Sequence, residues 1–380
     1  MTRRWWPSLL TALCLLPLIP FAASAGTYAL VFGAGEFADK QIKARPSAEN
    51  DAKAVYDLLT DKSVLGVNKN NIQLLLSTKD EKRDTIPATR ENFLKALKEI
   101  TGKATKDDLV FIYVVGQGAA SGDKACLFAS DSTFAERAKN ALFGGDIEGV
   151  FKDFKSEKLC VFLDLNLKGF EPGKESVLEP NILDFVRAFA GQVDKDEQTL
   201  PPGRSIMLAN GGIAPPVVVK GNGIFTLALV DALRGKADKE GYEPDGVVTI
   251  DELVKYLEKE VPPLARANGT TNEEKQQLPF LEYARTIHFV LTKNPAETEK
   301  VNARLKKFEE IEREAKLDKK VFEEGVRLLS RMPKLKALQE LRKQYQALAD
   351  GTVKAEEFLT KRKEIQEGMK IEKDVATNYS

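Results

Sequence analysis

From about residue 27 to residue 290, short unbroken runs of apolar residues alternate with segments in which apolar residues recur at the spacing of an amphipathic helix. Unbroken apolar runs are typical of parallel strands that are buried on both faces. Strands that alternate with helices predict an α/β fold, a doubly wound, mostly parallel sheet with helices on both faces. The predicted strands are 28–33, 71–76, 109–115, 159–163, 205–209 and 286–291. Two predicted helices begin at Pro46 and after the N-cap residue Thr89, and two more span 147–154 and 225–233.

Two of these strands lead into polar residues that are candidates for chemistry. The run 109–115 is followed by Gly116-Gln117-Gly118, and the run 159–163 by Asp164-Leu165-Asn166. In open α/β sheets, functional residues lie just beyond the carboxyl ends of the central strands. We therefore expect the functional edge of this sheet to include Gln117 and Asn166.

The first residues have the pattern of a secretory signal. Arg3 and Arg4 give a basic start, an apolar stretch interrupted by three prolines covers 5–21, and Ala23-Ser24-Ala25 supplies the small residues that a signal peptidase recognises. We predict that residues 1–25 are a signal peptide and that the protein is exported, to the periplasm or the medium. An uncleaved membrane anchor is the alternative, but the apolar stretch is short for one. No other segment is long and apolar enough to cross a membrane.

The amino-acid composition of the chain changes after Asn294-Pro295. Charged residues dominate there, glycine is scarce, and apolar residues recur at helical spacing within 301–311 and 335–348. This pattern predicts a C-terminal α-helical hairpin or coiled-coil arm over 294–380, which could serve self-association. The α/β domain is accordingly expected to span 26–293.

Charge and composition exclude some functions. Lys+Arg and Asp+Glu both number 57, so the net charge gives no reason to expect a nucleic-acid partner. A turn at Asp245-Gly246 followed by Glu252 resembles part of a calcium loop, but Thr249 and Glu252 fit a helix capping box better, and we expect no metal and no cofactor. Cys14 leaves with the signal, and we expect Cys126 and Cys160 to be buried free thiols rather than a disulfide.

Several short motifs occur in the order found in one known family. They are the opening strand at 28–33, Asn50-Asp51, the strip 113–118, the strand and acid at 127–131, the strip 164–169, Gly-Asn-Gly-Ile-Phe-Thr at 221–226, Asp245-Gly246 with Glu252-Leu253, and Gln277-Leu278-Pro279. Together they resemble the caspase/metacaspase family of clan CD cysteine peptidases, over roughly residues 27–290. The resemblance implies a caspase-like sheet.

The resemblance also shows what this chain lacks. The family has histidine between two glycines at the first strand tip and cysteine at the second, where this chain has Gln117 and Asn166. An asparagine amide forms no thiolate and a glutamine has no accessible pKa, so this pair cannot supply a nucleophile and a base. The only histidine, His288, lies in a predicted late strand and is read as structural.

Other family roles fall on residues that this chain keeps. The resemblance implies that Asp164, and less directly Asp131, line a pocket for a basic side chain; for Asp164 a turn-capping role is equally open. It implies that the backbone of the turns at Gly116, Gly118 and Gly169 could polarise a carbonyl oxygen.

Three functions remain open from the sequence. The first is an exported pseudopeptidase that binds or scaffolds a protein or peptide partner, with basic peptides as candidates. The second is an active cysteine endopeptidase that cleaves after basic residues with Cys126 or Cys160 as nucleophile. The third is a structural envelope or interaction protein that works through its helical arm.

Overall fold

The computed structural model describes residues 25–151, 154–167, 182–190, 203–210, 215–240, 244–284 and 289–300, and parts of 302–364. No helix in these ranges is both long and apolar enough to cross a membrane. The predicted signal, most of the predicted C-terminal arm and His288 lie outside the described residues. Helical residues of the arm are described at 295–300, 302–303, 306, 343–345, 347–348 and 355–364.

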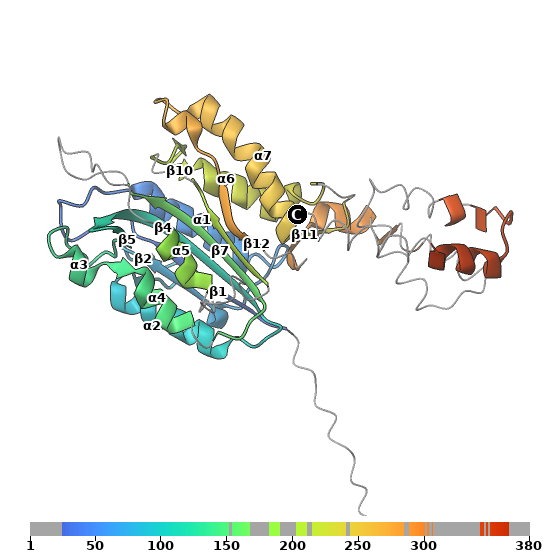
Figure 1. Ribbon diagram of the computed structural model, residues 1–380, viewed down its shortest axis with the longest axis horizontal. Coiled ribbons are helices and arrows are strands. Elements are labelled where there is room, and N and C mark those ends of the chain that lie inside the picture. The colour runs from blue at the N-terminus through green and yellow to red at the C-terminus, as the bar shows by residue number, and fades with distance from the viewer. Residues whose placement is uncertain are drawn as a thin grey trace, which may run out of the picture.

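A single large sheet forms the centre of the domain (Figure 1). Six neighbouring strands run parallel, and the edge strand β12 is antiparallel to its neighbour β8. In spatial order the strands are β12 (Phe280–Ala284), β8 (Arg204–Leu208), β7 (Lys158–Asn166), β4 (Leu109–Ser121), β1 (Thr27–Gly33), β2 (Ile72–Leu76) and β3 (Ile86–Pro87). The antiparallel strands β5 (Lys124–Leu127) and β6 (Leu142–Phe143) extend the sheet from the far end of β4.

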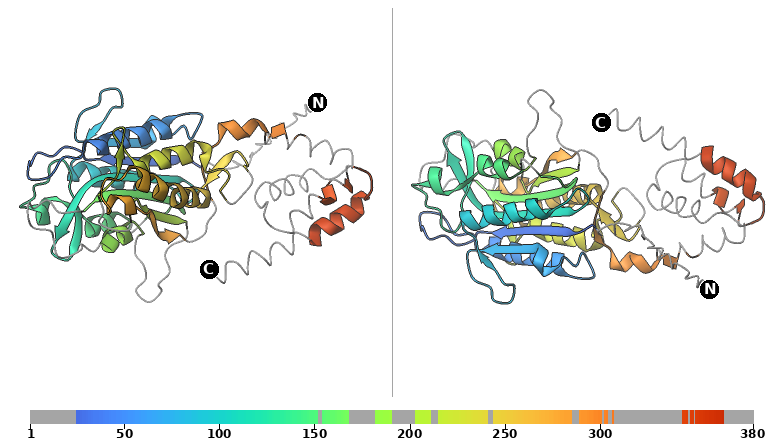
Figure 2. Two further views of the ribbon diagram at one scale, coloured as in Figure 1. Left: turned by 90° about the horizontal axis from the view of Figure 1, so that it is seen from above. Right: turned by 90° about the horizontal axis from the view of Figure 1, so that it is seen from below.

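Helices cover both faces of this sheet (Figure 2). One face packs against α1 (Pro46–Thr60), α6 (Ile224–Asp231) and α7 (Ile250–Asn268), and the other against α2 (Arg90–Lys103), α4 (Gly144–Phe151) and α5 (Ile182–Ala190). Successive residues of a strand point to opposite faces, and in β4 Phe111 and Tyr113 join the first core while Val110 and Ile112 join the second. This confirms the predicted fold class.

Short elements complete the described chain. They are the 3-10 turns Lys69–Asn71 and Glu274–Gln276, α3 (Arg137–Asn140), the hairpin of β9 (Val218–Val219) and β10 (Asn222–Gly223), a π-helical turn Ala232–Lys236, and a separate pair formed by β11 (Val247–Thr249) and β13 (Val290–Lys293).

Most predicted elements are confirmed, and the differences concern strand ends and elements that were not predicted. β4 continues to Ser121 and β7 to Asn166, so the expected turn residues Gln117 and Asn166 lie inside strands. The extension of β4 is stabilised by pairing with β7 and then with β5, contacts that are remote in sequence. The predicted strand 286–291 is only partly described; its described end is β13, which pairs with β11 and not with the main sheet. The edge strand β12 was not predicted.

Helix α1 lies unusually close to β1 because a glycine separates them. A Cβ atom added at Gly33 would stand 2.6 Å from the Cβ of Ala52 and 2.7 Å from the carbonyl oxygen of Ala48. The helix therefore approaches the strand at its carboxyl end, where the functional edge of the sheet begins. Asp51 is carried to that edge by this close packing.

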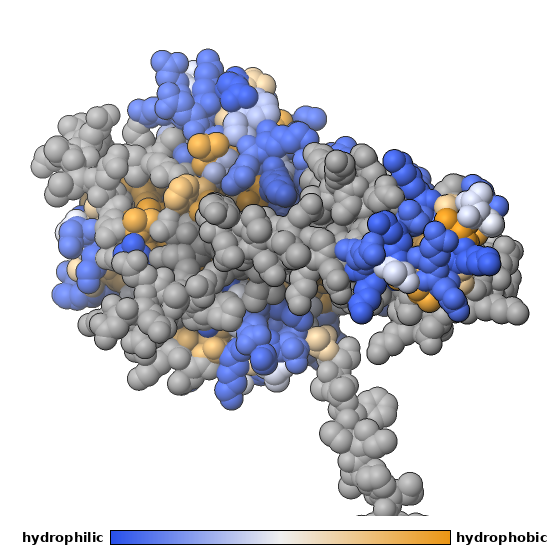
Figure 3. Space-filling model, turned by 45° about the vertical axis from the view of Figure 1, so that its right-hand side comes forward, coloured by the Kyte–Doolittle hydropathy of each residue, from blue (hydrophilic) through white to orange (hydrophobic). Residues whose placement is uncertain are grey.

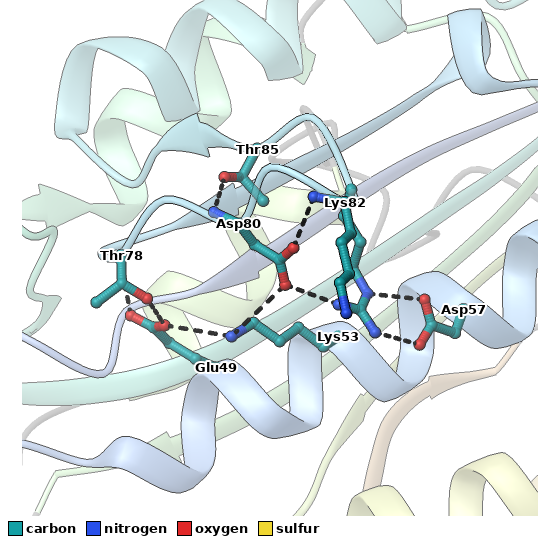
Figure 4. A network of polar contacts seen from close by, with 8 residues as sticks. Glu49, Lys53, Asp57, Thr78, Asp80, Lys82 and Thr85 are labelled. Carbon is teal, nitrogen blue, oxygen red and sulfur yellow. Dashed lines mark hydrogen bonds and ion pairs between the residues drawn. The ribbon is translucent and has the colours of Figure 1, made fainter.

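The outer side of α1 holds the loop that follows β2 through ion pairs (Figure 4). Lys53 lies 3.8 Å from both Glu49 and Asp80, and Arg83 contacts Asp57 and Asp80 at 2.7 Å each. Because Arg83 and Asp57 are partly or largely exposed, their pair contributes little to stability alone. The network orders the loop beside α1, and of its carboxylates that of Glu49 is buried.

The surface of the described residues can be seen on one face in Figure 3, where hydrophilic residues separate small hydrophobic areas. The large apolar residues that are exposed are Val218, Leu227, Leu278, Phe280, Val290 and Leu359.

Candidate functional site

The two predicted strand tips meet directly. β4 and β7 are parallel neighbours, and Gln117 is the register partner of Asn166. By the alternation of the strands, Gln117 points to the same face as Tyr113, which is the face covered by α1. The sequence thus predicted correctly that these two residues share one edge of the sheet.

The side-chain amide of Gln117 holds a neighbouring backbone segment in place. Only 2% of its surface is exposed, and its side-chain nitrogen donates a hydrogen bond to the backbone oxygen of Lys43 at 3.0 Å. Its backbone oxygen accepts from the amide of Phe128 at 2.9 Å. These bonds fix the tip of β4 beneath the segment 34–45, which crosses from β1 to α1. A glutamine held in this way offers no base to a neighbouring residue.

The two cysteines lie away from this tip. Cys160 is packed in the core beneath α1 and α6, whereas Cys126 belongs to the core on the opposite face of the sheet. Both are free and buried in the described structure. Burial raises the pKa of Cys126 to about 11 and raises that of Cys160 further. Both thiols are therefore protonated at neutral pH, the form that is a poor nucleophile.

Asp164 forms a buried ion pair with an arginine that the sequence analysis did not single out. The Nη2 of Arg45 donates to Oδ1 of Asp164 at 2.8 Å. The Nη1 of Arg45 donates to the backbone oxygens of Asp164, at 2.9 Å, and of Gly116, at 3.0 Å. Arg45 is 5% exposed and Asp164 is 3% exposed. One guanidinium therefore joins the ends of β4 and β7.

A second buried carboxylate lies beside this pair. Oδ1 of Asp51 accepts hydrogen bonds from the backbone amide of Gly223 and from the side chain of Asn222, both at 2.9 Å. A Cβ atom added at Gly223 would lie 3.1 Å from Oδ2 of Asp51 and 3.3 Å from Oδ2 of Asp164. Neither of those two oxygens accepts a hydrogen bond from the residues that the structure describes. Both carboxylates therefore face the backbone of the β9–β10 hairpin.

The five residues Arg45, Asp51, Asp164, Asn222 and Gly223 are called the Asp164 cluster below. It contains two carboxylates and one guanidinium, with Tyr113 beneath it; the Tyr113 hydroxyl shares a 2.6 Å hydrogen bond with Thr226. Burial raises the pKa of Asp51 to about 6, and the negative charge of Asp164 adds to the rise.

Burial and the neighbouring charges also shift the pKa values of Arg45 and Tyr113. Burial tends to lower the pKa of Arg45, but the adjacent carboxylate of Asp164 outweighs it and the net shift is upward. The pKa of Tyr113 lies well above its usual range, because the ring is buried and both carboxylates disfavour a phenolate. Arg45 is therefore charged and Tyr113 neutral at any physiological pH.

The other predicted site residues have different surroundings. Asp131 is exposed and accepts from the backbone amide of Arg90 at the start of α2, so the structure does not bring it into the cluster. A Cβ atom at Gly118 would meet the backbone oxygen of Cys126 at 2.4 Å, so this glycine serves the close β4–β5 pairing. Gly116 contributes its backbone oxygen to Arg45. Gly169 lies outside the described residues.

The sequence reasoning missed four residues of the Asp164 cluster, namely Arg45, Asp51, Asn222 and Gly223; the last two were noted only within the motif at 221–226. Asp51 was noted only as part of an Asn-Asp motif. Arg45 had one local signal: it stands at the N-cap of α1, where small polar residues are preferred, and its side chain makes no capping bond.

Comparisons with known proteins identify the family of this chain. A family model described as the caspase domain matches residues 27–289. The chain belongs to the caspase-domain family. Similar solved structures include caspase-1 from Spodoptera frugiperda, which is 15% identical and covers 71% of this chain and 91% of its own, with a TM-score of 0.45. A protein from Geobacter sulfurreducens is 15% identical, with 69% and 94% coverage and a TM-score of 0.45. The search of curated proteins found no match.

Within the caspase domain, the matched range contains every residue of the Asp164 cluster and both strand-tip amides. It also contains the sheet from β1 to β12 and the helices of both faces. The predicted family resemblance is thereby confirmed.

Proposed function

We propose that this protein is an exported caspase-domain pseudopeptidase, which binds or scaffolds a protein or peptide without cleaving it. The observation that carries the proposal is the register pairing of Gln117 with Asn166 at the tips of β4 and β7. Both side chains are amides, so the edge of the sheet offers neither a thiolate nor an imidazole to a peptide bond.

The surroundings of the two amides support the same conclusion. The Gln117 side chain is committed to the Lys43 backbone, and the two thiols lie in different cores on opposite faces of the sheet. An active endopeptidase that uses Cys126 or Cys160 would need a thiol that is accessible and easily ionised. The raised pKa values of both thiols oppose that reading.

The partner is the less defined part of the proposal. A basic peptide that used Asp164 would compete with Arg45, which already holds Oδ1 of that carboxylate. The helical arm is a further candidate for binding, and deleting residues from 296 onward tests it: partner binding that survives the deletion belongs to the caspase domain.

A restoration experiment tests the loss of catalysis. The full chain, the Asn166→Cys variant and the Gln117→His/Asn166→Cys double variant are incubated with fluorogenic peptides that end in Arg or Lys, with and without calcium. We expect no hydrolysis by the natural sequence in either condition. Hydrolysis by the natural sequence that disappears after alkylation of its thiols would refute the proposal and favour the active endopeptidase.

A further inference from the structure

We propose that the other residues of the Asp164 cluster, together with Gly116, form a guanidinium-binding site whose occupant is the chain's own Arg45. The segment 34–45 then acts as a built-in ligand that excludes arginine side chains of other polypeptides. The inference rests on the proposed function in one respect, that this edge of the sheet is used for binding. It does not depend on the loss of catalysis.

The contacts of Arg45 match the geometry of a guanidinium. Its two terminal nitrogens reach three oxygens that converge from β4 and β7, namely the backbone oxygens of Gly116 and Asp164 and the carboxylate of Asp164. A planar fork of N–H donors suits such a set of fixed acceptors, whereas an ammonium is a point charge. All three acceptors belong to the sheet, so the site exists apart from the segment that fills it.

The charge of the cluster favours a cation over any other ligand. Asp51 and Asp164 are both more than nine-tenths buried, and each has one carboxylate oxygen, Oδ2, without a hydrogen bond from the described residues. Both Oδ2 atoms face Gly223. With Arg45 in place, the cluster still holds one more carboxylate than guanidinium. Removing Arg45 leaves two buried carboxylates with no counterion among the described residues, which a cation would relieve.

Helix α1 gives an independent reason to regard Arg45 as a ligand. The residue stands at the N-cap, where a positive charge meets the positive end of the helix dipole and where its side chain makes no capping bond. Local preference therefore disfavours arginine at this position. The hydrogen bonds of its side chain to Asp164 and Gly116 offset this unfavourable position.

The segment that carries Arg45 is anchored by contacts other than those of the Arg45 side chain. Residues 34–45 contain neither helix nor strand. Phe37 and Ile42 are buried in the core on the other face of the sheet, and the amide of Ala34 donates to the backbone oxygen of Val115 at 3.2 Å. The group that would exchange is therefore the side chain of Arg45, while the segment stays in place. Release of Arg45 would break none of the hydrogen bonds of the central sheet.

The test uses the full chain with Arg45→Ala and measures the thermal unfolding midpoint. The midpoint is recorded in guanidinium chloride at about 20 mM, well below denaturing concentrations, and in ammonium chloride at equal ionic strength. N-acetyl-arginine amide and N-acetyl-lysine amide form a second pair of probes. Arg83→Ala is the matched control, because it removes an arginine whose ion pairs lie at the surface of the same domain.

We expect Arg45→Ala to lower the midpoint by on the order of 10 °C, since it leaves buried carboxylates unpaired. Guanidinium and the arginine amide should raise that midpoint more than ammonium and the lysine amide do. Neither the natural sequence nor Arg83→Ala should show the preference, and adding Asp164→Asn to Arg45→Ala should abolish it.

The proposal is overturned if the arginine probes give Arg45→Ala no advantage over the ammonium probes, or if the natural sequence gains equally. Should Arg45→Ala not fold, recovery of its circular dichroism by the arginine amide but not the lysine amide supports the proposal, and no recovery overturns it. Arg45→Gln, which fills more of the space, is compared in the same way. Because only binding and stability are measured, failure here leaves the proposed absence of catalysis untouched.

Discussion

Asp51 is the residue whose charge state links the site to pH. In the folded chain its carboxyl keeps a proton up to about pH 6, against a usual value of 3.8, because burial and the neighbouring Asp164 disfavour the anion. Between these two values the folded state binds more protons than the unfolded state, so the contribution of Asp51 to stability falls as pH rises. Above about pH 6 the folded protein carries the full cost of the charge.

Replacing Asp51 with Asn should remove that cost. The amide oxygen can still accept from Gly223, and the variant no longer has the Asp51 contribution to the loss of stability between pH 4 and pH 7. The contributions of other buried carboxyls with raised pKa values, Asp238 and Glu252, are unchanged. Relative to the natural sequence it should gain about 3 kcal/mol of unfolding free energy over this interval, from a shift of roughly two pH units. Urea denaturation at both pH values measures the difference. Asp57→Asn, at an exposed position on the same helix, is the control, and an equal gain there would contradict the assignment.

The Arg45–Asp164 pair gives a second prediction. Asp164→Ala leaves the guanidinium of Arg45 buried without the carboxylate that it hydrogen-bonds and should lower the unfolding free energy by about 3–5 kcal/mol. Asp57→Ala, which breaks an exposed pair with Arg83, should cost about 1 kcal/mol or less. The double variant Arg45→Met/Asp164→Leu should recover much of the loss, because an apolar pair can replace a buried ion pair. Equal effects of Asp164→Ala and Asp57→Ala in urea denaturation would show that the ion pair is not buried as described.

The cysteines give a third prediction at this scale. In the native chain near pH 7.5, iodoacetamide should modify Cys126 and Cys160 slowly, because both are buried and their raised pKa values leave little thiolate. Unfolding in urea should make both react at the rate of free cysteine. Peptide mass spectrometry after timed quenching measures each site separately. Rapid native modification of either thiol would reveal an ionised, accessible cysteine and would favour the endopeptidase alternative.

At the scale of elements, the contact of α1 with β1 places Asp51 at the edge of the sheet. Gly33→Ala inserts a methyl group between Ala48 and Ala52, so it should push the helix outward and cost about 1–3 kcal/mol. Gly102→Ala lies in α2 with no atom within 4 Å of the added Cβ, and should instead stabilise the chain by roughly 0.5–1 kcal/mol. Chemical denaturation of the two variants should show opposite signs, and a stable Gly33→Ala would contradict the close packing.

Elements with strong local signals were predictable from the sequence. The apolar runs of β1, β2, β4, β7 and β8 match the strands, Thr89 caps α2 by accepting from the amide of Asn92, and Thr249 forms the predicted capping box with Glu252. These features depend on residues within one or a few turns of each other.

Features that depend on distant contacts were not predictable. The extension of β4 across Gly116-Gln117-Gly118 looks like a turn, and only pairing with β7 and β5 makes it a strand. Arg45 meets Asp164 across 119 residues of sequence, and nothing local indicates that partner. The sequence therefore predicted the position of the site at Gln117 and Asn166, but not the ion pair of Arg45 with Asp164.

At the scale of the whole molecule, the described part of the caspase domain surrounds an edge of the sheet that carries Gln117 and Asn166. The sheet, both helical layers and the hairpin at Asp51 are present in the matched range 27–289. The polar groups of the edge are largely bonded to one another, Gln117 to Lys43 and Arg45 to Asp164. This arrangement supports the proposed binding role.

The most direct test of this account is a cleavage assay with a mixed peptide library. The purified full chain is incubated with the library near neutral pH, and new peptide termini are counted by mass spectrometry against a sample without protein and against a Gln117→Ala/Asn166→Ala variant. We predict that all three samples give the same termini. New termini that require the natural chain and are lost in the variant would contradict the account.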